Sequence, residues 1–147
     1  NKWDNLDDYQ RERFQDAVER KLEFVSFARR YTISALHGSG VGKLFRAIDE
    51  AYEAVQMRIS TPELTSALAE AQKEHQPPLV RGRRVKLRHA HIGGQDPLII
   101  VLHGKQVANL PGSYKRYLVN FFRKRFVIKA VPILLEFKND DNPYVDK

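Results

Sequence analysis

The sequence predicts an α/β segment followed by a small α+β domain. Helix, strand and helix patterns come before residue 60, whereas two strands, a helix and a last strand follow a helix that starts there. Charge divides the chain in a similar way. Residues 1–76 hold 11 lysines and arginines against 13 acidic residues, a net of −2, and residues 77–147 hold 14 against 5, a net of +9. This asymmetry indicates two modules with different partners, of which the second meets a polyanion.

The composition is that of a globular protein. Of its 147 residues, 42% are hydrophobic and none is cysteine. The longest apolar run, residues 98–102, is far shorter than the roughly 20 residues of a membrane-spanning helix, and no secretory signal opens the chain. We therefore expect a cytoplasmic location and no membrane partner. Because the chain begins at Asn1 without a methionine, we also expect a fragment of a longer polypeptide.

The first 60 residues are predicted to form a helix, a strand and a second helix. Two sets of apolar residues recur at the three- and four-residue spacing of an amphipathic helix. The sets are Phe14, Val18, Leu22 and Val25, and Val41, Leu44, Phe45, Ile48, Tyr52, Val55 and Ile59. Between them, residues 30–36 are β-branched and apolar and lead into the glycine-rich residues 37–40, which predicts a buried strand and a loop. This order is typical of the last αβα segment of an α/β domain.

A third helix is predicted to start after Ser60. Glu63 follows three residues later, which makes a capping box, and Pro62 suits the first helical turn. The helix should run to about Glu74 and end before the proline pair at residues 77–78.

Two strands are predicted after a basic turn at residues 81–84. Apolar and basic residues alternate over residues 85–88, as in a strand with one wet face, whereas residues 97–103 are apolar as in a central strand. The Gly-Gly-Gln-Asp stretch at residues 93–96 is expected to turn between them and make a hairpin.

The last two predicted elements are a helix from about Ser113 and a strand over residues 133–137, before a polar tail at residues 138–147. Large apolar and aromatic residues at helical spacing mark the buried side of the helix. They are Tyr114, Tyr117, Leu118, Phe121, Phe122 and Phe126. This spacing favours a core role for the aromatic rings over a base-stacking platform.

The residues most suggestive of chemistry are Asn1, Lys2 and Asp4, an N-K-x-D motif placed before a helix. Guanine presents N1–H and N2–H₂ side by side, and a carboxylate accepts both in a charge-assisted fork. Adenine has an acceptor at N1, which a carboxylate repels. The aliphatic stem of Lys2 can lie along the purine face, and Asn1 can tie the loop to neighbouring backbone.

A second segment, Ser34-Ala35-Leu36, follows about thirty residues later at the end of the predicted strand. Ligands bind at the carboxyl ends of strands in open α/β sheets, and the Ala35 N–H can donate to guanine O6. We therefore expect guanine to bind at the two segments together. The expected guanine-binding residues are Asn1, Lys2, Asp4, Ser34, Ala35 and Leu36.

These motifs, with residues 32–36, 77–78, 83–86 and 110–118, resemble the C-terminal portion of the Der (EngA) family. Members are bacterial ribosome-assembly GTPases with two tandem G domains and a KH-like domain. The resemblance covers essentially the whole chain. It implies that residues 1–60 are the C-terminal αβα piece of a P-loop GTPase G domain, the second of the two, and that residues 61–147 are a KH-like α-β-β-α-β domain.

The resemblance also implies GTP hydrolysis to GDP in the maturation of the large (50S) ribosomal subunit, with GTP or GDP as cofactor and Mg²⁺ held outside this chain. A working G domain needs a G-x-x-x-x-G-K-[ST] loop, a switch threonine and a D-x-x-G segment. The nearest stretch, residues 38–44, would need a glycine at the preceding position, which is His37, and has Leu44 in place of the hydroxyl. We expect no catalytic residue, no metal ligand and no hydrolysis by this chain alone.

The basic half is expected to contact ribosomal RNA, and so the large ribosomal subunit, through phosphates. The candidate residues share predicted exposed positions. They are Arg81, Arg83, Arg84, Lys86, Arg88, Lys115, Arg116, Arg123, Lys124 and Arg125. A single-strand clamp of the KH type needs G-x-x-G, and residues 104–107 end in Val107, so contact should depend on charge. Some of these residues could instead contact the upstream G domains; DNA is not an expected partner.

Two alternatives from other classes stay open. One is a nucleotide-independent RNA-binding module in which the N-K-x-D match is accidental. The other is a protein-docking domain whose basic face meets an acidic partner. Guanine-selective binding that is lost in Asp4→Ala argues against the first, and salt-insensitive association with ribosomal particles favours the second over phosphate contact.

Overall fold

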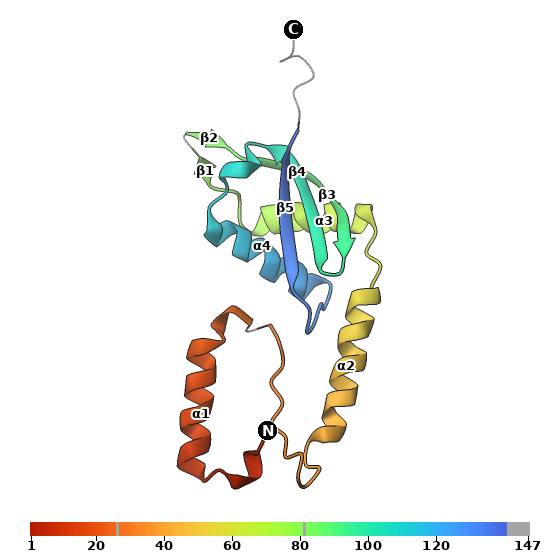
Figure 1. Ribbon diagram of the computed structural model, residues 1–147. Coiled ribbons are helices and arrows are strands. Elements are labelled where there is room, and N and C mark those ends of the chain that lie inside the picture. The colour runs from red at the N-terminus through yellow and green to blue at the C-terminus, as the bar shows by residue number, and fades with distance from the viewer. Residues whose placement is uncertain (26, 81, 141–147) are drawn as a thin grey trace. The chain divides into compact units, whose positions relative to one another are not determined.

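The computed structural model describes residues 1–25, 27–80 and 82–140, and the chain folds as two compact units (Figure 1). Unit 1 comprises Asn1–Ala54 with Lys129–Val131, and unit 2 comprises Val55–Ile128 and the residues from Pro132 on. The predicted domain boundary at residue 60 stays a prediction, because a division by contacts does not identify a domain of a longer protein.

Unit 1 is built of helices. A short 3-10 helix, η1 (Trp3–Asn5), precedes α1 (Asp8–Lys21), and a second 3-10 helix, η2 (Glu23–Val25), follows it before α2 (Val41–Gln56). These two α-helices confirm the periodic patterns, although α1 ends before Leu22 and Val25, the last two apolar residues of its set, and α2 ends before Ile59.

The start of α1 is held by a capping box. The Gln10 N–H donates to the Asp7 carboxylate at 2.7 Å, and the Asp7 N–H donates to the Gln10 side chain at 3.1 Å. Two of the backbone donors that every helix start leaves unpaired are satisfied in this way.

The buried strand expected at residues 30–36 is not formed. Within the described part of unit 1, Ser34 makes a single antiparallel bridge to Ser39, and no second strand lies beside this segment. Ser34 is buried, but Leu36 is 83% exposed. A strand exists only through ladder hydrogen bonds to a neighbour, so a β-prone segment without a neighbour stays extended but unpaired.

Unit 2 contains a three-stranded sheet with two helices on one face (Figure 1). The strands are β3 (Lys86–Gln95), β4 (Leu98–Lys105) and β5 (Ile133–Asn139); β3 pairs antiparallel with β4, and β5 pairs parallel with β4. The helices are α3 (Thr61–Glu74) and α4 (Gly112–Arg125). The order α-β-β-α-β agrees with the prediction.

Smaller elements complete unit 2. A hairpin of two-residue strands, β1 (Leu79–Val80) and β2 (Arg83–Arg84), stands where a basic turn was expected. The short 3-10 helix η3 (Val107–Asn109) connects β4 to α4.

The start of α3 confirms the predicted capping box. The Ser60 N–H donates to the Glu63 carboxylate at 2.9 Å, and the Glu63 N–H donates to the Ser60 hydroxyl at 3.4 Å.

The hairpin turn was predicted in the wrong place. β3 continues through Gly93 and Gly94 to Gln95, and the chain turns at Asp96 and Pro97 instead. A Cβ atom at Gly93 would collide with the side chain of Val101 on β4. Glycine is therefore required here for the close approach of two strands and not for a turn.

The aromatic residues of α4 face the core, as predicted. Phe122 and Leu118 are fully buried, and Tyr114 is 7% exposed. The Tyr114 hydroxyl donates to the His75 carbonyl and the Tyr117 hydroxyl to the Ala71 carbonyl, both at 2.8 Å. Each phenol thus satisfies a carbonyl at the C-terminal end of α3 and ties the two helices together.

We predict that Tyr114→Phe lowers the free energy of unfolding by about 1 kcal/mol, because the His75 carbonyl loses its donor. Burial raises the pKa of Tyr114 to about 12 from an ordinary value of 10.0. The folded state therefore resists ionisation of this phenol, and its stability falls as the pH rises from about 10 to about 12. Urea unfolding across this pH range should show a smaller alkaline loss for Tyr114→Phe than for the wild type.

The control for this prediction is Tyr52→Phe, the same change at a side chain that is 65% exposed. If both variants unfold at the same urea concentration at pH 7, the hydrogen bond to His75 does not contribute.

Candidate functional site

The N-terminal loop and the segment after residue 33 are tied together by backbone and side-chain hydrogen bonds. The Asn1 side-chain oxygen accepts from the Lys2 N–H at 2.8 Å and from the Ala35 N–H at 3.0 Å. The Trp3 N–H donates to the Ile33 carbonyl at 3.3 Å. The two predicted guanine-binding segments are therefore neighbours in space, although more than thirty positions separate them in sequence.

The Trp3 ring anchors this loop to α1. It meets the ring of Phe14 edge-on, with centroids 6.0 Å apart, and the Arg11 guanidinium lies 5.6 Å from its centroid. Lys2 adopts a left-handed conformation with φ 63°, at the sharp bend between Asn1 and η1.

Asp4 holds its carboxylate against the second segment. The Ser34 hydroxyl hydrogen-bonds to it, and His37 Nε2 lies 3.2 Å from its Oδ2 atom. The hydrogen bond from Ser34 is the main reason that the pKa of Asp4 lies below its ordinary value, with smaller help from its own backbone N–H and the charge of His37. Asp4 is thus an ionised acceptor at neutral pH.

Five of the six predicted guanine-binding residues meet in this arrangement, and the side chain of Leu36 points to solvent with 83% of its surface exposed. Two details were not foreseen. The Ala35 N–H, expected to donate to guanine O6, already donates to Asn1. His37 touches the carboxylate, and the only sequence signal for it was an imidazole directly after Ser-Ala-Leu.

The basic candidates of unit 2 differ in whether their side chains also contact other residues of the unit. Arg81 lies outside the described residues. Exposed side chains outside the ion pairs described next are those of Arg83, Arg84, Lys86, Arg116 and Lys124; Arg88 and Arg125 are also exposed but are paired. They are spread over the β1–β2 hairpin, the start of β3 and the solvent side of α4.

The remaining candidates contact other parts of unit 2. Arg88 pairs with Asp140 at 3.1 Å, and Arg125 pairs with Glu70 at 3.1 Å. The Lys115 ammonium lies 4.9 Å from the centroid of the Phe137 ring. Arg123 donates to the Ile128 carbonyl at 3.1 Å, and burial lowers its pKa.

The Gly104–Val107 stretch is a structural corner. Gly104 lies inside β4, where a Cβ atom would overlap the Lys86 carbonyl oxygen, and Val107 is fully buried. Gly104 and Val107 are thus enclosed by the fold, whereas Lys105 between them is exposed.

Three histidines form a row on the sheet. The His103 ring stacks on His89 at 4.4 Å and on His91 at 5.1 Å between centroids. Burial and the neighbouring imidazoles lower the pKa of His103. In the part of the chain that the structure describes, no three histidine, cysteine or acidic side chains are arranged to hold a metal ion.

Unit 2 therefore belongs to the class of α+β domains with a KH-like order of elements. Residues 58–138 match the family described as the KH-domain-like, C-terminal domain of EngA bacterial GTPase enzymes. The match spans more than half of the chain, and the chain belongs to this family, as the resemblance implied.

Relatives agree with this assignment. The chain is 56% identical over 144 residues to the GTPase Der of Coxiella burnetii (strain Dugway 5J108-111), which covers 98% of the chain and 32% of the relative. It is 55% identical over 147 residues to the GTPase Der of Pseudoalteromonas translucida (strain TAC 125), with 100% of the chain and 30% of the relative covered. The chain spans about a third of the length of these relatives.

Within residues 1–25, 27–80 and 82–140, no helix is both long enough and apolar enough to cross a membrane.

We predict that Ser34→Ala moves the pKa of Asp4 upward, because the carboxylate loses its strongest hydrogen-bond donor. Carbon-detected NMR titration of the aspartate carboxyl groups measures this directly. Ser39→Ala is the matched control, since it removes a hydroxyl from the same loop. An Asp4 titration midpoint that is the same in both variants contradicts the role assigned to Ser34.

Proposed function

We propose that this chain supplies guanine recognition and an RNA-contacting KH-like domain to a GTPase that acts in assembly of the large ribosomal subunit. The observation that carries the guanine part is the bond from Ala35 to Asn1, which brings the N-K-x-D and Ser-Ala-Leu segments to one place. The names of the relatives, GTPase Der, and the family match support the class of the whole protein.

The chemistry of the site suits guanine. The Asp4 carboxylate is ionised and lies at the junction of the two segments, where it can accept N1–H and N2–H₂ together. His37 Nε2 contacts the Oδ2 atom of this carboxylate, so guanine would displace the imidazole. The Ala35 N–H would turn from Asn1 toward O6, or serve both acceptors in a three-centre bond.

The exposed apolar side of α2 supports the proposal that unit 1 is part of a larger G domain. Phe45, Ile48 and Tyr52 follow one another at helical spacing and are 66%, 63% and 65% exposed. Such a stripe normally packs on a sheet. In the proposed whole protein, that sheet also supplies the strand partner for residues 30–36, and the phosphate loop, Mg²⁺ ligands and catalytic groups lie in the same upstream portion.

The test of guanine recognition is Asp4→Asn in the complete protein of which this chain is part. An amide offers N–H₂ where guanine also has N–H₂, so GDP affinity at this site should fall roughly 10- to 100-fold, while xanthosine diphosphate, with an oxygen at that position, should gain. Calorimetric titration with both nucleotides measures the exchange.

The control variant is Asp8→Asn, which changes a fully exposed carboxylate four residues away. Equal GDP affinity in the two variants, with no gain for the xanthine nucleotide, would falsify guanine recognition by Asp4. The nucleotide-independent RNA-binding module would then be the better description.

RNA contact is proposed for the exposed basic residues of unit 2, because this half of the chain carries a net charge of +9 and several of its arginines are open to solvent. Contact by this route does not need a glycine clamp, and it depends on salt. Ribosomal RNA is the proposed partner, and residues already paired within the fold, such as Arg88 and Arg125, contribute less.

We predict that the double variant Arg84→Ala/Lys86→Ala weakens binding to ribosomal RNA and makes the slope of log affinity against log salt shallower by about 1 for each lost phosphate contact. Arg46→Ala, an exposed arginine on α2, is the control and should leave the slope unchanged. Association that does not vary with salt in the wild type would point to protein docking instead.

A further inference from the structure

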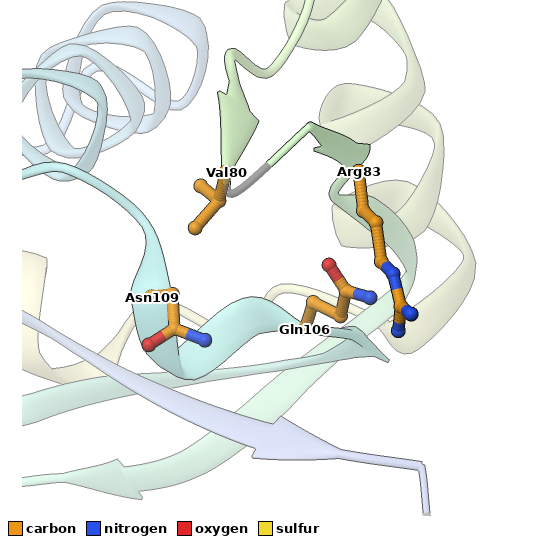
Figure 2. Close-up of a pocket in the computed structure, with 4 residues that line it drawn as sticks. All are labelled: Val80, Arg83, Gln106 and Asn109. Carbon is orange, nitrogen blue, oxygen red and sulfur yellow. The ribbon is translucent and has the colours of Figure 1, made fainter.

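A hollow of about 420 Å³ lies between the β1–β2 hairpin and η3. Arg83 is the one described RNA-contact candidate in its lining. Val80, Arg83, Gln106 and Asn109 line it, and Figure 2 shows the first two on the hairpin side and the other two on the side of η3. Its size is within the range of sites that hold a small ligand and is too small for a nucleic acid duplex.

The described side chains that line the hollow offer a positive charge and amide hydrogen-bonding groups. Among the residues that the structure describes, the lining has one guanidinium, two carboxamides and one apolar side chain, and no carboxylate. A guanidinium binds phosphate through a planar fork, whereas a carboxamide presents a donor beside an acceptor, which matches a base edge such as N6 and N7 of adenine. The side chain of Val80 can contact the apolar face of a sugar or a base.

Gln106 is held in place by the fold. Its backbone is left-handed, with φ 62° and ψ 25°, which is uncommon for a residue with a side chain. The next residue, Val107, is fully buried, and its N–H donates to the Asn139 side chain of β5 at 3.0 Å. In Figure 2 the Gln106 carboxamide extends from this fixed point toward the hairpin.

The surroundings favour an anion. Arg84 follows Arg83 on the hairpin, and Lys105, which precedes Gln106, is paired in register with Lys86 on β3. All four of these cationic side chains are exposed. The nearby carboxylate of Asp140, whose N–H donates to the Gly104 carbonyl, is neutralised by Arg88 at 3.1 Å.

We propose that this hollow binds one nucleotide of a single-stranded RNA, with Arg83 on the phosphate and Gln106 and Asn109 on the base edge. The inference rests on the proposed RNA contact of unit 2 and adds a defined site to it. It also gives the domain a way to hold a single strand without a G-x-x-G clamp.

The experiment is an NMR titration of the 147-residue protein with hexaadenylate, the same hexamer in a duplex, adenosine monophosphate and inorganic phosphate. The side-chain N–H₂ signals of Gln106 and Asn109 should shift with the single strand, and at much higher concentration with the mononucleotide. The duplex and inorganic phosphate should leave them in place. Gln15 and Gln56, exposed side chains on α1 and α2, are controls in the same spectra.

Two variants complete the test. Gln106→Gly removes the side chain and keeps the left-handed backbone without strain, and Arg83→Ala removes the fork. Each should weaken hexaadenylate about tenfold, and Arg83→Ala should also make the salt slope shallower by about 1, whereas Gln106→Gly should not. Gln56→Ala, on α2, is the control and should bind like the wild type.

The hollow is not the site if Gln106→Gly binds hexaadenylate like the wild type, or if Gln15 and Gln56 shift as much as Gln106. This result differs from a failure of the proposed function. If the protein binds no RNA at low salt, the proposed RNA contact is wrong. If RNA binds and Arg84→Ala/Lys86→Ala weakens binding while Gln106→Gly and Arg83→Ala do not, the exposed basic residues contact RNA and the hollow does not.

Discussion

Burial of the inner face of the β3–β4–β5 sheet under α3 and α4 is the constraint on which unit 2 depends. Leu64 and Leu68 of α3, Leu118 and Phe122 of α4, and Ile100 of β4 are all fully buried, and each contributes roughly 1.5–3 kcal/mol relative to an exposed side chain. The described charged side chains of the unit lie outside this core. The hairpin and η3 are then attached at one end of a rigid layer, which is why residues as distant as Val80 and Gln106 can line one hollow.

The elements that could be predicted from the sequence are those whose cause is local. The Ser60–Glu63 capping box and the spacing of the α4 aromatics lie within a few residues of the structure they produce, and both predictions hold. The errors concern segments whose conformation depends on a distant partner. Gly93 looks like a turn residue until Val101 is placed against it, and residues 30–36 have strand composition but no strand beside them.

The candidate sites follow the same division. The meeting of Asn1 with Ala35 was within reach of sequence reasoning, because both belong to motifs with known chemistry. His37 at Asp4, and Arg83 near Gln106, were not, since neither pair has a fixed spacing and the left-handed backbone of Gln106 has no signature in its residue type. On α2, the sequence pattern correctly marks Phe45, Ile48 and Tyr52 as an apolar face. In the described part of unit 1, no other element covers this face.

The contacts of Asp4 also bear on how long a guanine nucleotide would stay bound. Ser34 and His37 satisfy the carboxylate when the site is empty, so departure of the base does not strand an unpaired charge. If guanine binds at Asp4 as proposed, the imidazole of His37 would return to the carboxylate as the base leaves. This substitution would shorten the residence time of the nucleotide.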